Sequence, residues 1–214
     1  MPSFATRFPA LFSHSARQHA SVASVVTQGL DLQARLTTVA GAELATGHLP
    51  GSPPRQLRLC CLRTPTKVKI FMYLVDIDRL STRANLFYKG CAPSDGCAAR
   101  PLPETGRHLF FDCPRAAAVW NRLDVPIPAG SFSLWDLPVP ASTSLSTWSF
   151  ILAAILWSIW KSRNNLVFNG VSHSTGSTLR RAGDGIAVWR WWLRPADRAP
   201  LDSLRAFILA RAVT

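Results

Sequence analysis

The feature that most constrains this fold is a set of three metal-capable side chains in one short stretch of chain. Cys97 is followed by His108, and Cys113 comes five positions after that histidine. Thiolates and an imidazole in this arrangement are typical of a small structural zinc site, which takes four ligands in a tetrahedron. Residues 91–103 are rich in Pro, Gly and small side chains and are expected to form a loop. The sequence therefore predicts a loop and a short helix that converge on one ion.

Proline and glycine limit the length of the remaining elements. The 214 residues include 16 Pro and 12 Gly, which interrupt long regular structure. Hydrophobic residues make up 48% of the chain, so a core can still be built. We predict a mainly α fold, in which residues 61–170 form a small, irregular, helical, zinc-knuckle-like domain. A disordered N-terminal region is expected over residues 1–60, and a basic, Trp/Arg-rich helical tail over residues 171–214.

Helical periodicity and capping signals place the individual elements. Thr82 is suited to cap a helix that Gly90 stops, and Pro114 suits the first turn of another. The uncharged run over residues 148–160 is shorter than the roughly 20 residues that span a bilayer, so it is interpreted as a buried core helix. Pro195 and Pro200 are expected to separate the last two helices. Helices are predicted over residues 67–74, 82–88, 104–111, 114–125, 147–167, 179–193 and 201–212.

The charge balance favours a polyanionic partner. Lys and Arg number 24 against 12 Asp and Glu, which gives a formal net charge of +12. Nucleic acid is the usual partner of such a chain, because each phosphate that a cation neutralises releases counterions. One alternative is left open: the base composition of the coding sequence can enrich arginine without any selected function.

The five cysteines bear on the cellular compartment. An odd number, with no signal peptide ahead of them, fits metal ligation inside the cell better than a disulfide framework. Residues 1–29 contain Arg7 and Arg17 and no acidic residue, which is the composition of an organellar transit peptide, although an unselected leader explains it as well. Nucleus, cytoplasm and organelle are all left open as locations.

A string of landmarks surrounds the metal-capable set. In order, they are Pro65-x-Lys67-Val68-x-x-Phe71, Thr82-x-x-x-Leu86, Cys97, Glu104-Thr105, His108-Leu109-Phe110, Cys113 and Val119-Trp120. This order resembles the zinc-binding region of plant non-LTR (LINE-like) retrotransposon reverse transcriptases. Residues 156–168 are similar to the Trp-x-x-Trp-x-x-Arg-Asn segment that follows this region in the same polyproteins. The resemblance covers about residues 62–170.

The resemblance implies a zinc ion held by Cys97, His108 and Cys113, and it exposes one departure. Arg100 stands where the family pattern has the second cysteine of a Cys-x-x-Cys pair, and a guanidinium cannot coordinate zinc. Three of the four ligands remain, and Cys91 in the same loop is the candidate substitute. The alternative is that the two cysteines are small hydrophobic residues and that His108 is an ordinary helix histidine.

The same resemblance, together with the positive charge, implies RNA or single-stranded DNA as the partner. Cationic contacts are expected from Lys67, Lys69, Arg100, Arg107, Lys161 and Arg163. The tryptophans allow two roles: Trp148, Trp157 and Trp160 are expected in the core, while Trp189, Trp191 and Trp192 are left open between core packing and base stacking. Neither a membrane nor a small-molecule substrate is expected as a partner.

Catalysis is not expected from this chain. Polymerase and ribonuclease H sites need clustered carboxylates that hold metal ions, whereas the acidic residues here are few and scattered. Asp76 and Asp78 are the only close pair, and a solvated turn is their expected role. No Gly-rich phosphate loop and no nucleophile motif occurs. The alternatives to a binding module are an inactive retroelement relic and a residual enzyme fragment.

Overall fold

The computed structural model describes residues 59, 61–130, 133–141 and 143–213, and over these residues it is helical. No strand occurs among them, and an isolated bridge joins Gly96 to Pro103. The prediction of a mainly α fold is therefore confirmed. The disordered region and leader expected over residues 1–60 lie almost wholly outside the described residues. Residues 57–214 form one compact unit, which includes the segment expected to be a tail.

Six α-helices and three shorter helical turns make up this described part of the chain. The α-helices are α6 (Thr66–Asp76), α7 (Arg83–Tyr88), α8 (Pro114–Arg122), α9 (Leu145–Asn169), α10 (Thr175–Trp189) and α11 (Pro195–Ala210). The turns are η1 (His108–Asp112, a π-helix), η2 (Leu134–Asp136) and η3 (Arg190–Trp192). Several boundaries follow local signals: the Thr82 hydroxyl accepts a hydrogen bond from the Asn85 N–H at 3.2 Å, and Pro114 occupies the first turn of α8.

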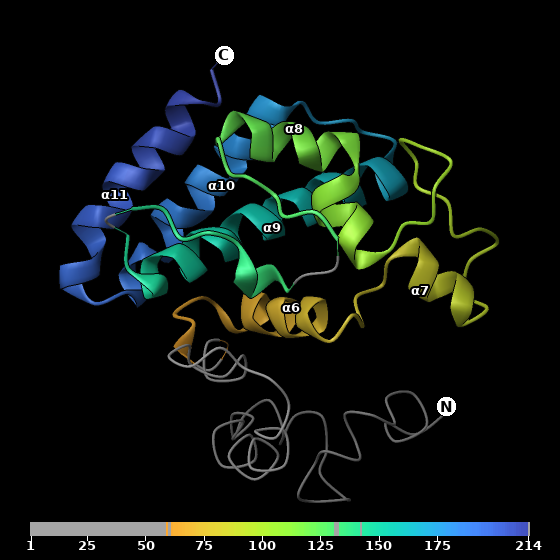
Figure 1. Cartoon of the computed structure of the whole chain (residues 1–214), viewed down its shortest axis with the longest axis horizontal. Coiled ribbons are helices and arrows are strands. Elements are labelled where there is room, and N and C mark those ends of the chain that lie inside the picture. The colour runs from red at the N-terminus through yellow and green to blue at the C-terminus, as the bar shows by residue number, and fades with distance from the viewer. Residues whose placement is uncertain (1–58, 60, 131–132, 142, 214) are drawn as a thin grey trace, which may run out of the picture. The chain divides into compact units, whose positions relative to one another are not determined.

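Helix α9 runs through the middle of this unit (Figure 1). It contacts α6, α10, α11 and η1. Every side chain from residue 150 to residue 156 is at most 2% exposed, because neighbours cover the helix on all sides. Burial of each large apolar side chain stabilises the fold by about 1.5–3 kcal/mol. The core-helix prediction for residues 148–160 is confirmed, and no helix within the described ranges is long and apolar enough to cross a bilayer.

Helices α10 and α11 pack against α9 and against each other. Gly183 of α10 allows this close approach, since a Cβ atom there would lie 2.6 Å from a Leu209 methyl group. Helix α11 begins at Pro195, so the prediction that Pro200 separates two helices was wrong. The loss of one backbone hydrogen bond at Pro200 is offset by the burial of Leu201 and Ile208.

The tryptophans divide between the interior and the surface. Trp148 is 5% exposed, and Trp157 and Trp160 pack partly buried against the core, as expected. Phe71 of α6 meets the Trp157 ring edge-on at a centroid distance of 5.1 Å, which joins α6 to α9. Trp189 is also buried.

Trp191 and Trp192 are 65% and 53% exposed. The guanidinium groups of Arg190 and Arg198 each lie 4.9 Å from the centre of the Trp191 ring. Cations therefore accompany the exposed Trp191 ring, and a stacking role for these two tryptophans stays a prediction.

Candidate metal centre

The loop before η1 holds the first sulfur. The Cys97 N–H donates to the Leu102 carbonyl at 2.8 Å and closes a tight turn next to the bridge between Gly96 and Pro103. Within that turn, the Ala99 N–H points at the Cys97 Sγ at 3.4 Å. This contact holds the Cys97 side chain in one orientation. The turn therefore prepares Cys97 as a ligand.

A π-turn brings the other two ligands together. The Thr105 hydroxyl accepts the His108 N–H at 3.1 Å, and the Cys113 N–H then donates to the His108 carbonyl at 2.7 Å. Residues five apart on an α-helix would be rotated by about 140° from each other. The i to i+5 bond of a π-turn widens the turn and leaves His108 and Cys113 on the same side.

The three predicted ligands converge. One ligand atom each from Cys97, His108 and Cys113 lie within 4.8 Å of one another, and the two sulfurs are 3.9 Å apart. Tetrahedral zinc with Zn–S bonds of about 2.3 Å places two sulfurs about 3.8 Å apart. The His108 Nε2 is buried and has no hydrogen-bond partner in the described part of the chain. Two sulfurs at zinc spacing beside an unpartnered imidazole nitrogen fit a zinc ion.

The electrostatic surroundings of Cys113 disfavour its thiolate in the absence of a cation. Burial raises the pKa of the Cys113 thiol, and the nearby Cys97 adds to this rise. The backbone N–H groups of Arg115 and Ala116, at the start of α8, lower the same pKa but do not cancel the rise. A divalent cation between the two sulfurs would remove the cost of ionising them side by side.

A buried ion pair joins the loop to α9. Glu104 is 1% exposed and Arg163 of α9 is 8% exposed. The Arg163 Nε donates to one carboxylate oxygen at 3.1 Å and its Nη2 donates to the other. The Arg83 N–H donates to Glu104 as well, at 2.9 Å. A guanidinium held in this way is not available to a phosphate, so the nucleic-acid contact expected of Arg163 does not fit its position.

The remaining loop candidates lie apart from the cluster. Cys91 is exposed, its thiol is 3.5 Å from the Lys89 carbonyl, and it does not belong to the group of converging ligands. Arg100 is exposed, three positions after Cys97 in the same turn. The structure therefore does not bring Cys91 to the place where a fourth ligand is expected.

The other cations proposed for nucleic acid differ in access. Lys67 on α6 and Lys161 on α9 are exposed, while Lys69 is half-buried. Arg107 is half-buried and its Nε lies 3.0 Å from the Asp112 carboxylate. Lys67 and Lys161 are therefore the most accessible of these four residues.

A comparison with protein families covers the same part of the chain. Residues 58–120 match the family model described as zinc-binding in reverse transcriptase. Residues 58–120 are a reverse transcriptase zinc-binding domain. This zinc-binding domain contains the whole Cys97, His108 and Cys113 cluster, and the similarity noted over residues 156–168 lies beyond it. No curated protein and no solved structure matches the chain.

Two contacts of the zinc-binding domain were not predicted from the sequence. Glu104 was a landmark without a role, and its partner Arg163 is 59 positions away. Arg115 donates to the Ser172 hydroxyl at 3.1 Å and to the His173 carbonyl at 3.2 Å, and so ties the domain to the segment before α10. No local pattern signals either contact, because both depend on how the helices pack.

Proposed function

We propose that the zinc-binding domain holds one Zn²⁺ through Cys97, His108 and Cys113, and that the chain is a non-catalytic, nucleic-acid-binding module derived from a LINE-like retroelement of plant type. The convergence of three ligands inside the matched domain carries this conclusion. The bound ion would supply a cross-link between the loop and the π-turn, as structural zinc does.

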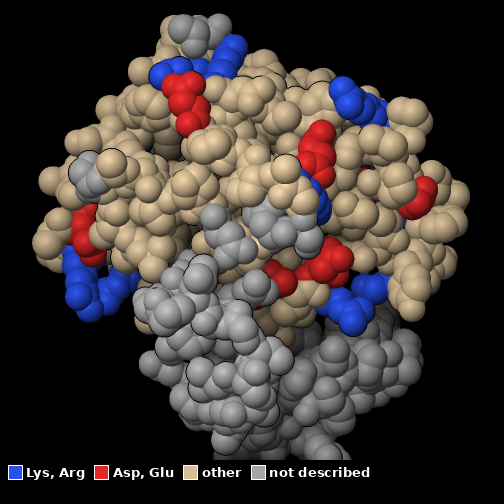
Figure 2. All heavy atoms as spheres, viewed as in Figure 1, with Lys and Arg blue, Asp and Glu red and all other residues tan. Residues whose placement is uncertain are grey.

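The net charge of +12 supports a polyanionic partner. On the face shown in Figure 2, however, Lys and Arg groups are scattered and several lie beside Asp or Glu groups, so this face carries no continuous basic field. The proposed contacts are therefore dispersed cations, of which Lys67, Lys161 and Arg100 are exposed. Dispersed cations suit binding that follows a flexible, single-stranded backbone without reading its sequence.

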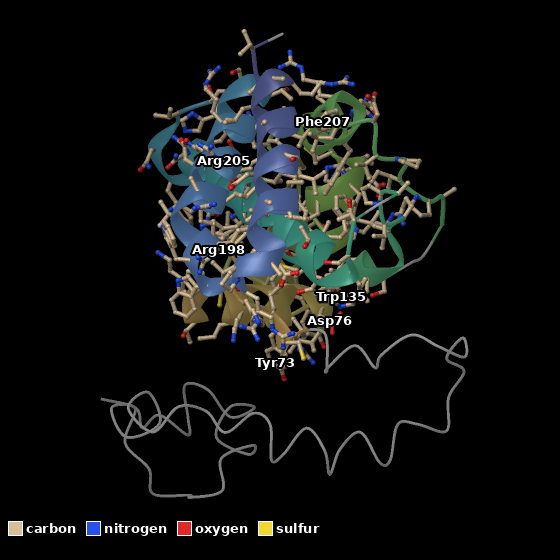
Figure 3. All side chains as sticks on the ribbon, turned by 90° about the vertical axis from the view of Figure 1, so that its left-hand side faces the viewer. Tyr73, Asp76, Trp135, Arg198, Arg205 and Phe207 are labelled. Atoms are coloured by element: carbon tan, nitrogen blue, oxygen red, sulfur yellow. The ribbon has the colours of Figure 1, made fainter. Side chains whose placement is uncertain are left out.

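The positions of the acidic residues support a non-catalytic role. Asp76 lies beside Trp135 (Figure 3), and its carboxylate accepts the Trp135 Nε1–H at 2.8 Å. Asp78 occupies a left-handed turn with φ of 49°. Within the described ranges, one group of three or more potential metal ligands converges, and it consists of Cys97, His108 and Cys113. The Asp76 and Asp78 pair thus serves packing and a turn rather than a two-metal centre.

Binding of the full-length chain to a labelled single-stranded RNA, measured by fluorescence anisotropy across a salt series, tests the nucleic-acid part. We expect affinity to fall steeply with salt, with a log–log slope of about 0.7 per phosphate contacted. Lys161→Gln should weaken binding to all sequences alike and reduce the slope by about that amount.

Arg79→Gln is the matched control, because it removes one exposed charge outside the proposed contacts. Equal losses in both variants would show that only net charge matters. If binding is absent, or does not respond to salt, the nucleic-acid role is wrong and the inactive relic becomes the better explanation.

A further inference from the structure

A small cavity adjoins the metal centre. Its volume is about 200 Å³, and both Cys97 and Cys113 line it, whereas His108 does not. The cavity therefore lies on the sulfur side of the cluster. Its other polar lining comes from α8, α9, α10 and the segment before α10, and includes Arg115, Ser162, Arg163, Ser172, His173 and Thr178.

The described residues supply three donors to the metal and no fourth. No other Cys, His, Asp or Glu in the described ranges joins the converging group. Glu104 lines the same cavity, but Arg163 and the Arg83 N–H already bind its carboxylate. Zinc with three protein ligands keeps its fourth position for a ligand from outside the protein, as catalytic zinc sites do.

The charge around the cavity favours an anion. A divalent ion with two thiolates and a neutral imidazole carries no net charge. The Arg163 charge is neutralised by Glu104. Arg115 binds a hydroxyl and a carbonyl, and it has no carboxylate partner among the described residues, so its positive charge is uncompensated.

The size of the cavity limits the ligand. Pockets for drug-sized molecules measure about 300–1,000 Å³, so a cavity of about 200 Å³ suits an ion or a molecule of a few atoms.

We propose that the fourth position on a metal bound by Cys97, His108 and Cys113 would be filled from outside the chain, by a small anion held in this cavity. The inference rests on the proposed metal centre and goes beyond it, since it assigns the centre a ligand-binding role. Arg100 lies three positions after Cys97, which is the spacing of a Cys-x-x-Cys pair, so a cysteine introduced there is a candidate fourth ligand.

Cobalt substitution tests the inference with azide as the anionic probe. The full-length chain is loaded with one Co²⁺, and its visible d–d absorption is followed during an azide titration. We expect a saturable shift of the absorption bands in the parent chain and in Arg100→Ala. Arg100→Cys should show no shift, because a fourth thiolate then occupies the position. Arg115→Gln should raise the azide Kd roughly tenfold, through loss of a charge-assisted contact.

The outcomes distinguish failure of anion binding from failure of the proposed metal centre. If the parent does not bind Co²⁺, the proposed metal centre is wrong. If Co²⁺ binds and azide leaves its spectrum unchanged, the chain completes the sphere with a donor of its own and the ligand-binding role is overturned. An azide response of the same size in Arg100→Cys overturns it too, because the anion would then bind away from the fourth position.

Discussion

The loop that carries Cys97 and the helices around α9 are held together by different means. Residues 98–103 of the loop are all exposed, and the loop is ordered by backbone hydrogen bonds, the cysteine turn and the buried Glu104. Around α9, by contrast, large apolar side chains are almost fully buried. Apolar burial scales with area and tolerates the loss of single contacts, whereas the loop depends on a few strong ones. The two regions should therefore respond differently to the same perturbation.

The largest expected effect comes from breaking the ion pair that joins the two regions. Arg163→Met leaves the Glu104 carboxyl group buried without its guanidinium partner. Its cost should be about 3–5 kcal/mol in the free energy of unfolding, as for other broken buried pairs. Chemical denaturation followed by circular dichroism measures this difference.

A double variant is the control for this prediction. Arg163→Met combined with Glu104→Gln removes both charges and should recover much of the stability. If the double variant lost as much stability as Arg163→Met and Glu104→Gln lose together, the two residues would not be energetically coupled. The loop would then be held to α9 by other contacts.

Metal removal should separate the two regions most clearly. At a free metal concentration 100 times Kd, binding stabilises the folded chain by roughly 2.7 kcal/mol. A chelator should therefore lower stability by a similar amount. Hydrogen exchange should quicken at the Cys97 and Leu102 amides while α9 amides stay protected. Uniform loss of protection would show that loop and helices unfold as one unit.

The smallest expected effect contrasts an exposed ion pair with the buried one. Asp202 of α11 pairs with Arg190, and the Asp202 side chain is 46% exposed. Asp202→Asn keeps the shape and removes the charge, and should cost about 0.5 kcal/mol, a loss that shrinks further in high salt. Thermal unfolding in low and high salt provides the measurement. A loss as large as that of Arg163→Met would contradict the view that burial sets the strength of these pairs.

Local signals predicted most of the helices. Thr82 caps α7, Pro114 begins α8, and the uncharged run over residues 148–160 forms the core of α9. These features act within a few residues, through one hydrogen bond, one fixed φ angle or one continuous apolar stretch. Pro200 misled the prediction, because its local cost is offset by the burial of Leu201, which no local pattern shows.

In the candidate site, the ligands were predicted from the sequence, whereas the turn and the ion pair that position them were not. Cys97, His108 and Cys113 were chosen by residue type and spacing, and the structure brings them together. The π-turn that aligns His108 with Cys113 was not predicted, since the sequence suggested only a short helix. Arg163 was assigned to nucleic acid from the resemblance and the positive charge of the chain, whereas in the structure it pairs with Glu104 from a distant segment.

The sequence by itself determined which side chains can bind a metal, the presence at position 100 of an arginine, which cannot, and the helical character of the chain. These properties belong to single residues and to short-range backbone preferences. Only the tertiary structure decided the burial of Arg163, the ends of α11 and the cavity beside Cys97 and Cys113. The reason is physical: burial, charge pairing and cavities arise between segments far apart in sequence, and their energies exist only once the helices have packed.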